Sequence, residues 1–157
     1  MIYIPFSPEE FELANLINEK GLIWKPKPGD WFLDLSNLRV TYSGTYEQSV
    51  GISLVVDQDG RGFSYLELII DGEENGNRMK KSLSYGKKDK FSQMRWVPSV
   101  ADCISIINNS EGYRFLALEY HDDSYIASLK NINNNEKSTA LGKTAVIAFY
   151  KLILELK

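Results

Sequence analysis

The segment Ala145–Leu156 reads AVIAFYKLILEL, and its hydrophobic residues recur on nearly every side of a helix. They form two stripes, one of Ala145, Ala148, Phe149, Leu152 and Leu156 and one of Ile147, Tyr150 and Leu154. A helix that is apolar nearly all round is covered on several sides, either at the centre of a core or by another subunit. The second stripe exceeds what one sheet face needs to cover, so it predicts a homo-oligomer, most simply a dimer.

Two further helices are marked by the residues that begin and end them. Ser7 and Glu10 have the spacing of a capping box, and Gly21 predicts the end of the helix that they begin. Ser99 is the predicted N-cap of a second helix, and Asp102 three residues later supports it. Both helices are therefore expected close to these boundaries.

The remaining chain alternates strand-like runs with turn residues. Strands are predicted at 31–35, 38–42, 50–56, 63–70, 113–120 and 125–129. Turn residues at 57–62 and 121–124 close two hairpins, and residues 131–137 are a predicted loop. The order of elements predicts an α+β fold in which an antiparallel sheet is flanked by helices, formed by a single domain of residues 1–157.

Composition bounds the class of protein. The chain has 157 residues, of which 43% are hydrophobic and 25% charged, as in ordinary globular proteins. Cys103 is the only cysteine, so no internal disulfide can form, which fits a reducing compartment. The N-terminus, MIYIPFSPEEF, lacks the pattern of a signal peptide, and no apolar run approaches the roughly 18 residues of a membrane span. We therefore expect a soluble cytoplasmic protein that does not engage a membrane.

Basic charge is concentrated in Arg78–Arg95, which reads RMKKSLSYGKKDKFSQMR. This stretch carries a formal charge of +6 and the remainder −9, which together make the net charge of −3. Aromatic residues lie between its lysines and arginines. Aromatic rings can stack on a nucleotide base while cations bind its phosphates. The candidate ligand-binding residues are Lys80, Lys81, Lys87, Lys88 and Arg95 on phosphates, with Tyr85 or Trp96 stacking. A solvated loop between strand and helix is the alternative interpretation.

Other motifs favour structural interpretations. Gly142-Lys143-Thr144 lacks the earlier glycine of a phosphate-binding loop, so it is interpreted as the entry of the last helix. Asp57-Gln58-Asp59-Gly60 resembles the start of a calcium loop, but its fifth position is Arg61, so a hairpin turn is favoured. Cys103 is expected to be a buried thiol on the inner face of the second helix.

Glu119, His121 and Asp123 form the cluster in which an activity would first be sought. A histidine beside carboxylates can serve acid–base catalysis or bind a metal. The segment is also typical of a solvated turn, and His121 is the only histidine. We therefore predict neither a catalytic role for His121 nor a cofactor.

Three motifs resemble a known group of proteins: W-x-P-x-P-G-D-W at Trp24–Trp31, W-x-P-S at Trp96–Ser99 and G-K-T-A-x-x-A at Gly142–Ala148. The chain resembles small uncharacterised phage and prophage proteins of Gram-positive bacteria, and its second half is similar to phage α-β-α sandwich domains. The resemblance implies an accessory phage protein in the host cytoplasm and supplies no site residue.

These observations predict a non-catalytic protein that binds a small anionic, nucleotide-like ligand or a host protein, and that counters a bacterial defence. The net charge of −3 and the pI near 5.3 argue against general nucleic-acid binding. Two other classes stay open. One is a small hydrolase or metal-dependent enzyme that uses Glu119, His121 and Asp123, and the other is an assembly protein that acts through its terminal helix.

Overall fold

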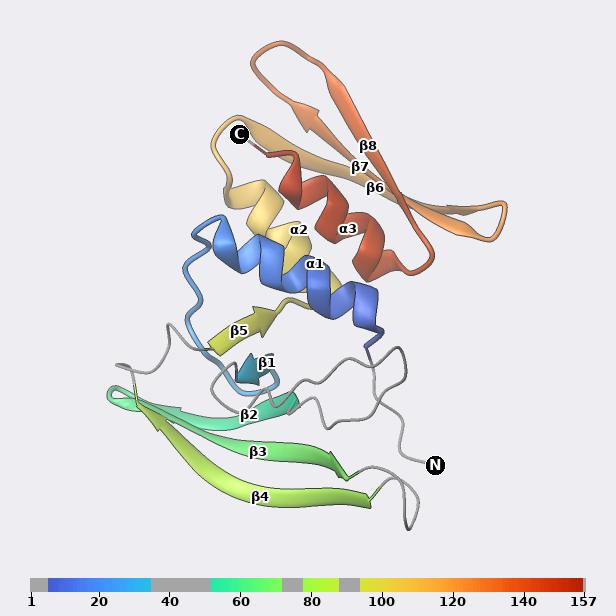
Figure 1. Ribbon diagram of the computed structural model, residues 1–157. Helices are drawn as coiled ribbons and strands as arrows, with labels where there is room; N and C mark the ends of the chain where they lie inside the picture. The colour runs from blue at the N-terminus through green and yellow to red at the C-terminus, as the bar shows by residue number, and fades with distance from the viewer. Residues whose placement is uncertain (1–5, 35–51, 72–77, 88–93, 157) are drawn as a thin grey trace. The chain divides into compact units, whose positions relative to one another are not determined.

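The computed structural model describes residues 6–34, 52–71, 78–87 and 94–156. These residues form the α+β fold that the sequence predicts, with the antiparallel strands divided between two sheets where one was expected (Figure 1). The helices are α1 (Pro8–Glu19), α2 (Val100–Asn109) and α3 (Ala145–Leu154). The strands are β1 (Trp31–Asp34), β2 (Ile52–Asp59), β3 (Gly62–Asp71), β4 (Arg78–Lys87), β5 (Met94–Val97), β6 (Tyr113–His121), β7 (Ser124–Asn131) and β8 (Lys137–Gly142).

The described residues group into two compact units. The first unit is built from the described residues of Ile23–Val97, and the second from those of Phe6–Leu22 and Pro98–Lys157. Each unit contains one sheet, and all three described helices belong to the second unit. The single domain predicted from chain length remains a prediction, because two compact units can unfold together or separately.

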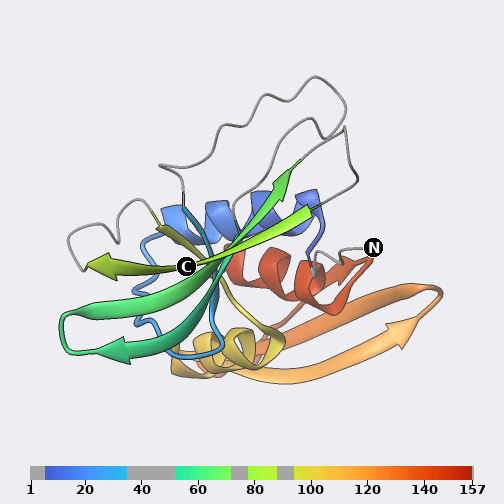
Figure 2. The same cartoon turned by 90° about the horizontal axis from the view of Figure 1, so that it is seen from below.

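The sheet of the first unit has the strand order β4-β3-β2-β1-β5. A bulge between Val55 and Asp57 interrupts the pairing of β2 with β3, and Figures 1 and 2 show that these strands bend along their length. One face of this sheet carries a buried cluster of Phe32, Val55, Phe63, Tyr65 and Met94. Trp24 packs against this cluster. Aromatic rings from β1 and β3 thus form the core of this unit.

The second unit places α3 against α1, α2, β7 and β8. Figure 1 shows the helices on one side of the sheet β6-β7-β8. Two of the three residues in the second apolar stripe of α3 are covered, since Ile147 is 2% and Tyr150 0% exposed, whereas Leu154 is half-buried. Most of the apolar surface from which the sequence predicts self-association is therefore buried within the chain. The homo-oligomer stays a prediction, with less support from this stripe.

Local signals located the helices well. Ser7 and Glu10 form the predicted capping box of α1, and Ser99 and Asp102 form one at the start of α2. Gly21 has a φ of 88°, which suits the residue just beyond the end of α1.

Among the described residues, none of these helices combines the length and apolarity that crossing a bilayer requires.

The strands were predicted less completely. Residues 78–87 form β4, so the loop interpretation of the basic stretch is wrong for that part. Residues 137–142 form β8, which the sequence did not predict. The turn at 57–62 is narrower than predicted, because β2 continues to Asp59 and β3 begins at Gly62. The predicted strand 38–42 lies outside the described residues, as do residues 35, 50 and 51 of the predicted strands on either side.

Candidate functional site

A pocket of about 330 Å³ lies at the turn end of the β2–β3 hairpin. We call it the hairpin pocket, and it is lined by Trp24, Lys25, Pro26, Gln58, Asp59, Gly62 and Phe63. Its volume is near the lower end of the range for small-molecule sites, which are concave, largely apolar and furnished with a few polar groups. The hairpin pocket has this composition, since aromatic rings and a proline meet one amide, one carboxylate and one ammonium group.

Aromatic packing holds the apolar wall of the pocket in place. The Trp24 ring centroid lies 5.3 Å from that of Phe32 and 5.5 Å from that of Phe63. Phe32 and Phe63 are fully buried, whereas Trp24 is half-buried. Trp24 therefore keeps part of its indole at the surface while the rest is anchored in the core, an arrangement that prepares a ring for contact with a ligand.

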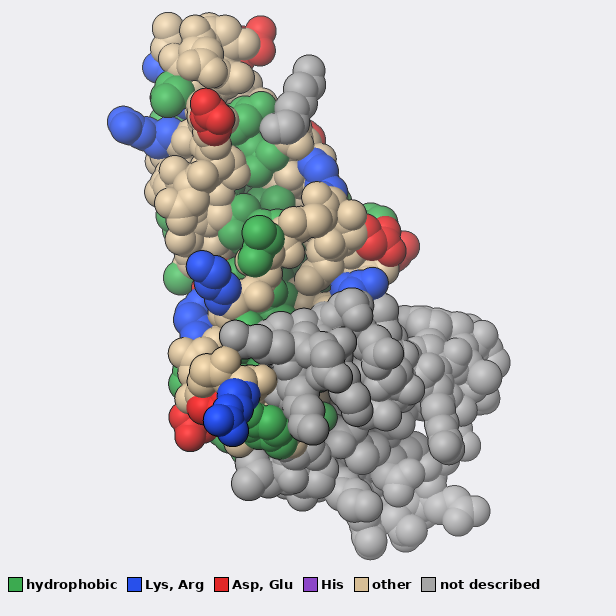
Figure 3. All heavy atoms as spheres, turned by 90° about the vertical axis from the view of Figure 1, so that its left-hand side faces the viewer, with side chains coloured by type: hydrophobic (Ala, Val, Ile, Leu, Met, Phe, Trp, Pro, Cys, Tyr) green, Lys and Arg blue, Asp and Glu red, His purple; other side chains and the backbone are tan. Residues whose placement is uncertain are grey.

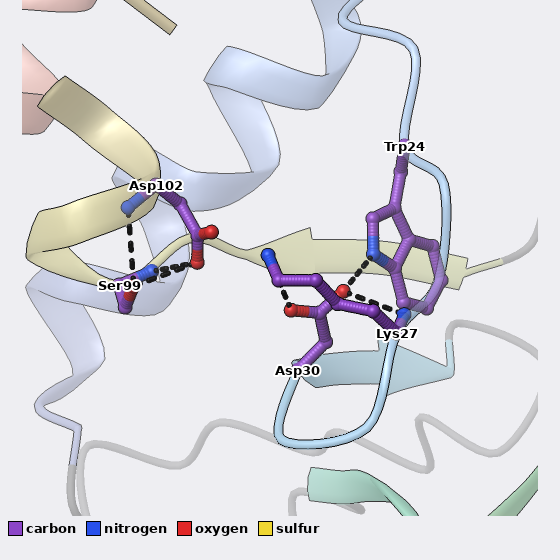
Figure 4. A network of polar contacts seen from close by, with 5 residues as sticks. All are labelled: Trp24, Lys27, Asp30, Ser99 and Asp102. Atoms are coloured by element: carbon purple, nitrogen blue, oxygen red, sulfur yellow. Dashed lines mark hydrogen bonds and ion pairs between the residues drawn. The ribbon is translucent and has the colours of Figure 1, made fainter. Parts of the chain in front are cut away.

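A buried carboxylate fixes the orientation of the Trp24 indole (Figure 4). Asp30 is 3% exposed, and its Oδ2 accepts hydrogen bonds from Trp24 Nε1 at 2.9 Å and from the Lys27 amide at 3.1 Å. Lys27 Nζ lies 3.3 Å from Asp30 Oδ1. The Asp30 amide also donates to the Lys27 carbonyl at 3.1 Å, and Gly29 between them has a φ of 94°. The P-G-D part of the tryptophan motif thus forms a tight turn that positions the indole.

Asp59, which also lines the pocket, stabilises the turn of the β2–β3 hairpin. Its Oδ1 accepts hydrogen bonds from the amides of Arg61 at 2.7 Å and Gly62 at 2.9 Å. The Tyr85 hydroxyl donates to both carboxylate oxygens, at 3.0 and 3.1 Å. The Arg61 amide first and the Tyr85 hydroxyl second hold the pKa of Asp59 below its ordinary value. Desolvation and the bond to Asp59 raise the pKa of Tyr85, so the phenol stays protonated at neutral pH.

These contacts confirm a hairpin turn at the sequence that resembles a calcium loop. They also connect the basic stretch to the pocket, because Tyr85 lies on β4. In the β3–β4 register Lys87 is the partner of Gly62 and Gly86 is the partner of Phe63. The end of the basic strand therefore lies beside residues that line the pocket.

The other predicted ligand-binding residues are distributed more widely. Lys80 and Lys81 also lie on β4, but they pair with Ile69 and Leu68, toward the other end of β3. Lys88 lies outside the described residues. On the face drawn in Figure 3, the Lys and Arg side chains of the described residues are scattered among hydrophobic and uncharged ones. The described side chains on that face therefore do not form a basic patch.

Arg95 and Trp96 lie on β5, the edge strand opposite β4 in the hydrogen-bonding order. Arg95 is half-buried. Trp96 is 8% exposed and pairs with the fully buried Phe32, so its ring belongs to the core and does not offer a stacking surface. Of the two rings predicted to stack, Tyr85 is the exposed one, at 46%.

The alternative cluster lies at the tip of the β6–β7 hairpin. His121 is exposed, and its Nδ1 lies 2.9 Å from Asp122 Oδ2. Asp123 accepts a hydrogen bond from the Tyr120 hydroxyl at 3.1 Å. Asp122 and Asp123 have φ values of 48° and 59°, as in a two-residue hairpin turn. In the described part of the chain, no group of three or more His, Cys, Asp or Glu residues could hold a metal ion.

The remaining motifs have structural roles. Cys103 is fully buried, and burial raises the pKa of its thiol, so the nucleophilic thiolate is suppressed. Thr144 caps α3 by accepting a hydrogen bond from the Ile147 amide at 3.2 Å. A Cβ atom at Gly142 would lie 2.4 Å from the Ala148 amide nitrogen, so this position requires glycine. The interpretation of Gly142-Lys143-Thr144 as a helix entry is confirmed.

The predicted residues Tyr85 and Lys87 lie on the strand beside the pocket, but none of the residues that line the pocket was predicted to bind a ligand. Trp24 and Asp59 were both noticed, as part of a turn motif and as a turn residue, and no signal in the sequence placed them together.

No protein-family model matches the chain, and neither a curated protein nor a solved structure matches it. The argument for function therefore rests on the pocket itself.

Proposed function

We propose that this chain is a non-catalytic binding protein that holds a small anionic ligand with a flat ring, of the nucleotide type, in the hairpin pocket. The observation that carries the proposal is the juxtaposition of an oriented, half-buried Trp24 with the end of the basic strand β4. A flat ring gains from contact with an indole, and phosphate groups gain from nearby ammonium groups.

Each polar residue of the pocket has a role in this proposal. The ring of the ligand lies against Trp24, and the exposed Gln58 amide can both donate to and accept from its polar edge. Lys25, also exposed, supplies an ammonium group to the phosphates, and the basic strand β4 ends beside the residues that line the pocket. Asp59 does not oppose this arrangement strongly, because its charge is already spread over three hydrogen-bond donors.

Phage origin and a role against a bacterial defence are part of the proposal and rest on the motifs at Trp24–Trp31, Trp96–Ser99 and Gly142–Ala148. The chemistry of the pocket is compatible with capture of a nucleotide signal, a role that needs binding without turnover. The alternative is that a host protein, not a small ligand, binds the same aromatic surface. In that case nucleotides would not bind there and would not compete with the protein.

The test is a thermal-shift screen of the full chain against nucleoside mono-, di- and triphosphates and cyclic dinucleotides. A ligand at about 100 times its Kd stabilises the folded state by about 2.7 kcal/mol, which is readily measured. We expect at least one nucleotide to raise the Tm, and Lys25→Glu to remove the shift. Lys143→Glu is the matched control, because Lys143 is exposed and lies outside the pocket lining. A shift that survives in Lys25→Glu, or no shift with any nucleotide, contradicts the proposal.

A further inference from the structure

Three cations face one another across the sheet of the second unit. In the strand registers, Arg114 on β6 is the partner of Lys130 on β7, and Lys130 is the partner of Lys137 on β8. We call these three residues the cation row. Partner residues in antiparallel strands have Cβ atoms about 4.5–5.5 Å apart, so the three positive side chains leave the sheet side by side.

The cation row lies on the face of the sheet that the helices do not cover. The Phe115 ring centroid lies 5.5 Å from that of Phe149 on α3, and Leu129 is 2% exposed. Residues 115 and 129 therefore face the helices, and their neighbours Arg114 and Lys130 face the other way because strand side chains alternate. Arg114 and Lys137 are exposed and Lys130 is half-buried.

The fold gains nothing evident from this arrangement. Like charges directly opposite each other on neighbouring strands are destabilising. Among the described residues, no ion pair includes Arg114, Lys130 or Lys137. A row of mutually repelling cations that crosses all three strands near one end of an ordered sheet is therefore better explained by an anionic partner than by the stability of the chain.

The same face also carries exposed apolar side chains. Leu141 is 59% exposed, and it follows Lys137 and Thr139 in the alternation along β8. Leu116 is 44% exposed and lies two residues after Arg114, in the bulge of β6. Exposed leucines on a face that also carries charged groups fit the anatomy of a protein interface, in which an apolar centre is bordered by a polar rim.

We propose that the open face of β6-β7-β8 binds an acidic segment of a partner protein, whose carboxylates meet the cation row and whose apolar residues cover Leu116 and Leu141. Nucleic acid fits this face less well. The cation row and the two leucines include no aromatic ring on which a base could stack, and the chain is acidic overall, with a pI near 5.3. This site is separate from the hairpin pocket and does not depend on the function proposed for it.

The experiment measures fluorescence anisotropy of a fluorescein-labelled peptide of alternating glutamate and leucine, titrated with the full chain. Lys130→Glu reverses the central charge of the row, and Lys143→Glu changes an exposed lysine that is not part of it. We expect Lys130→Glu to weaken peptide binding by about ten-fold or more, since close charge pairs at interfaces are worth at least about that factor. Lys143→Glu and Lys25→Glu should leave peptide binding unchanged, so failure of this proposal is distinct from failure of the pocket.

Two further readouts keep the test decisive. Lys130→Glu places a carboxylate between Arg114 and Lys137, so its Tm should rise above that of the wild type, and Lys130→Gln should show a smaller rise. A single-stranded oligonucleotide of equal negative charge should bind more weakly than the peptide. Peptide binding that is absent in the wild type, retained in Lys130→Glu, or no stronger than oligonucleotide binding overturns the proposal.

Discussion

Tyr150→Phe is the sharpest test of the position assigned to α3. Tyr150 is 0% exposed, and its hydroxyl donates to the Pro98 carbonyl at 2.6 Å. The substitution removes one oxygen atom and changes little else, so the ring packing is retained and the buried carbonyl loses this donor. Such a loss costs about 1–3 kcal/mol. For a chain of this size each 1 kcal/mol corresponds to about 2–4 °C, so the expected fall in Tm is about 2–12 °C.

The assay can separate the two units. All three described helices belong to the second unit, and all three tryptophans, Trp24, Trp31 and Trp96, belong to the first. Urea unfolding followed by circular dichroism at 222 nm therefore reports mainly the second unit, whereas tryptophan fluorescence reports the first. We expect the dichroism midpoint of Tyr150→Phe to fall, and a parallel fall in the fluorescence midpoint would indicate one cooperative domain.

Tyr120→Phe is the control for this experiment. Tyr120 is 63% exposed and its hydroxyl donates to Asp123 at the hairpin tip, so its removal should change stability by no more than about 0.5 kcal/mol. A dichroism midpoint for Tyr150→Phe that equals that of the wild type would refute the assignment of α3 to the centre of the second unit.

Three further predictions concern stability. The pair Ile147→Glu and Leu154→Glu should abolish the helical dichroism signal, because Ile147 is 2% exposed; a folded monomer would instead indicate that this stripe is an interface. Folding lowers the pKa of Asp59 below its ordinary value of 3.8. The ionised carboxylate therefore stabilises the folded state at pH values above 3.8, and this stability is lost as the pH falls below 3.8. In Asp59→Asn the free energy of unfolding should fall less steeply between about pH 5 and 2 than in the wild type. An equally steep fall in both proteins would contradict this prediction. Ser128→Ala should leave stability equal or higher, because Ser128 Oγ is buried and has no hydrogen-bond partner among the described residues; a loss above about 1 kcal/mol speaks against it.

The helices could be predicted because their signals are local. Ser7 needs only the Glu10 amide and side chain within one turn, and Ser99 needs only Asp102, so the capping boxes are visible in four consecutive residues. The two missed strands depend on partners elsewhere. The lysine-rich residues of β4 pair with β3 along its whole length, and the polar residues of β8 form the edge strand beside β7. Pairing overrides the weak strand propensity of both segments.

The candidate site shows the same limit. The basic stretch was visible as charge, but the sequence offered Tyr85 or Trp96 as the stacking ring, and only the structure shows that Tyr85 is the exposed one. The pocket, however, joins Trp24 from a turn motif to Asp59 and Phe63 from a hairpin, and only the sheet brings them together. Trp96 was predicted to stack because it follows the basic stretch, but its pairing with Phe32 on β1 buries it. Position along a strand, not neighbourhood in sequence, decides which ring is available.

The most direct test of the proposed binding site is an NMR titration of the full chain with adenosine diphosphate. The account predicts that the indole N–H signal of Trp24 and the side-chain amide signals of Gln58 shift progressively, because both groups belong to residues that line the hairpin pocket. Signals from β6, β7 and β8 should stay unchanged, and Lys25→Glu should weaken the effect. Trp24 and Gln58 signals that remain fixed at millimolar nucleotide would contradict the account.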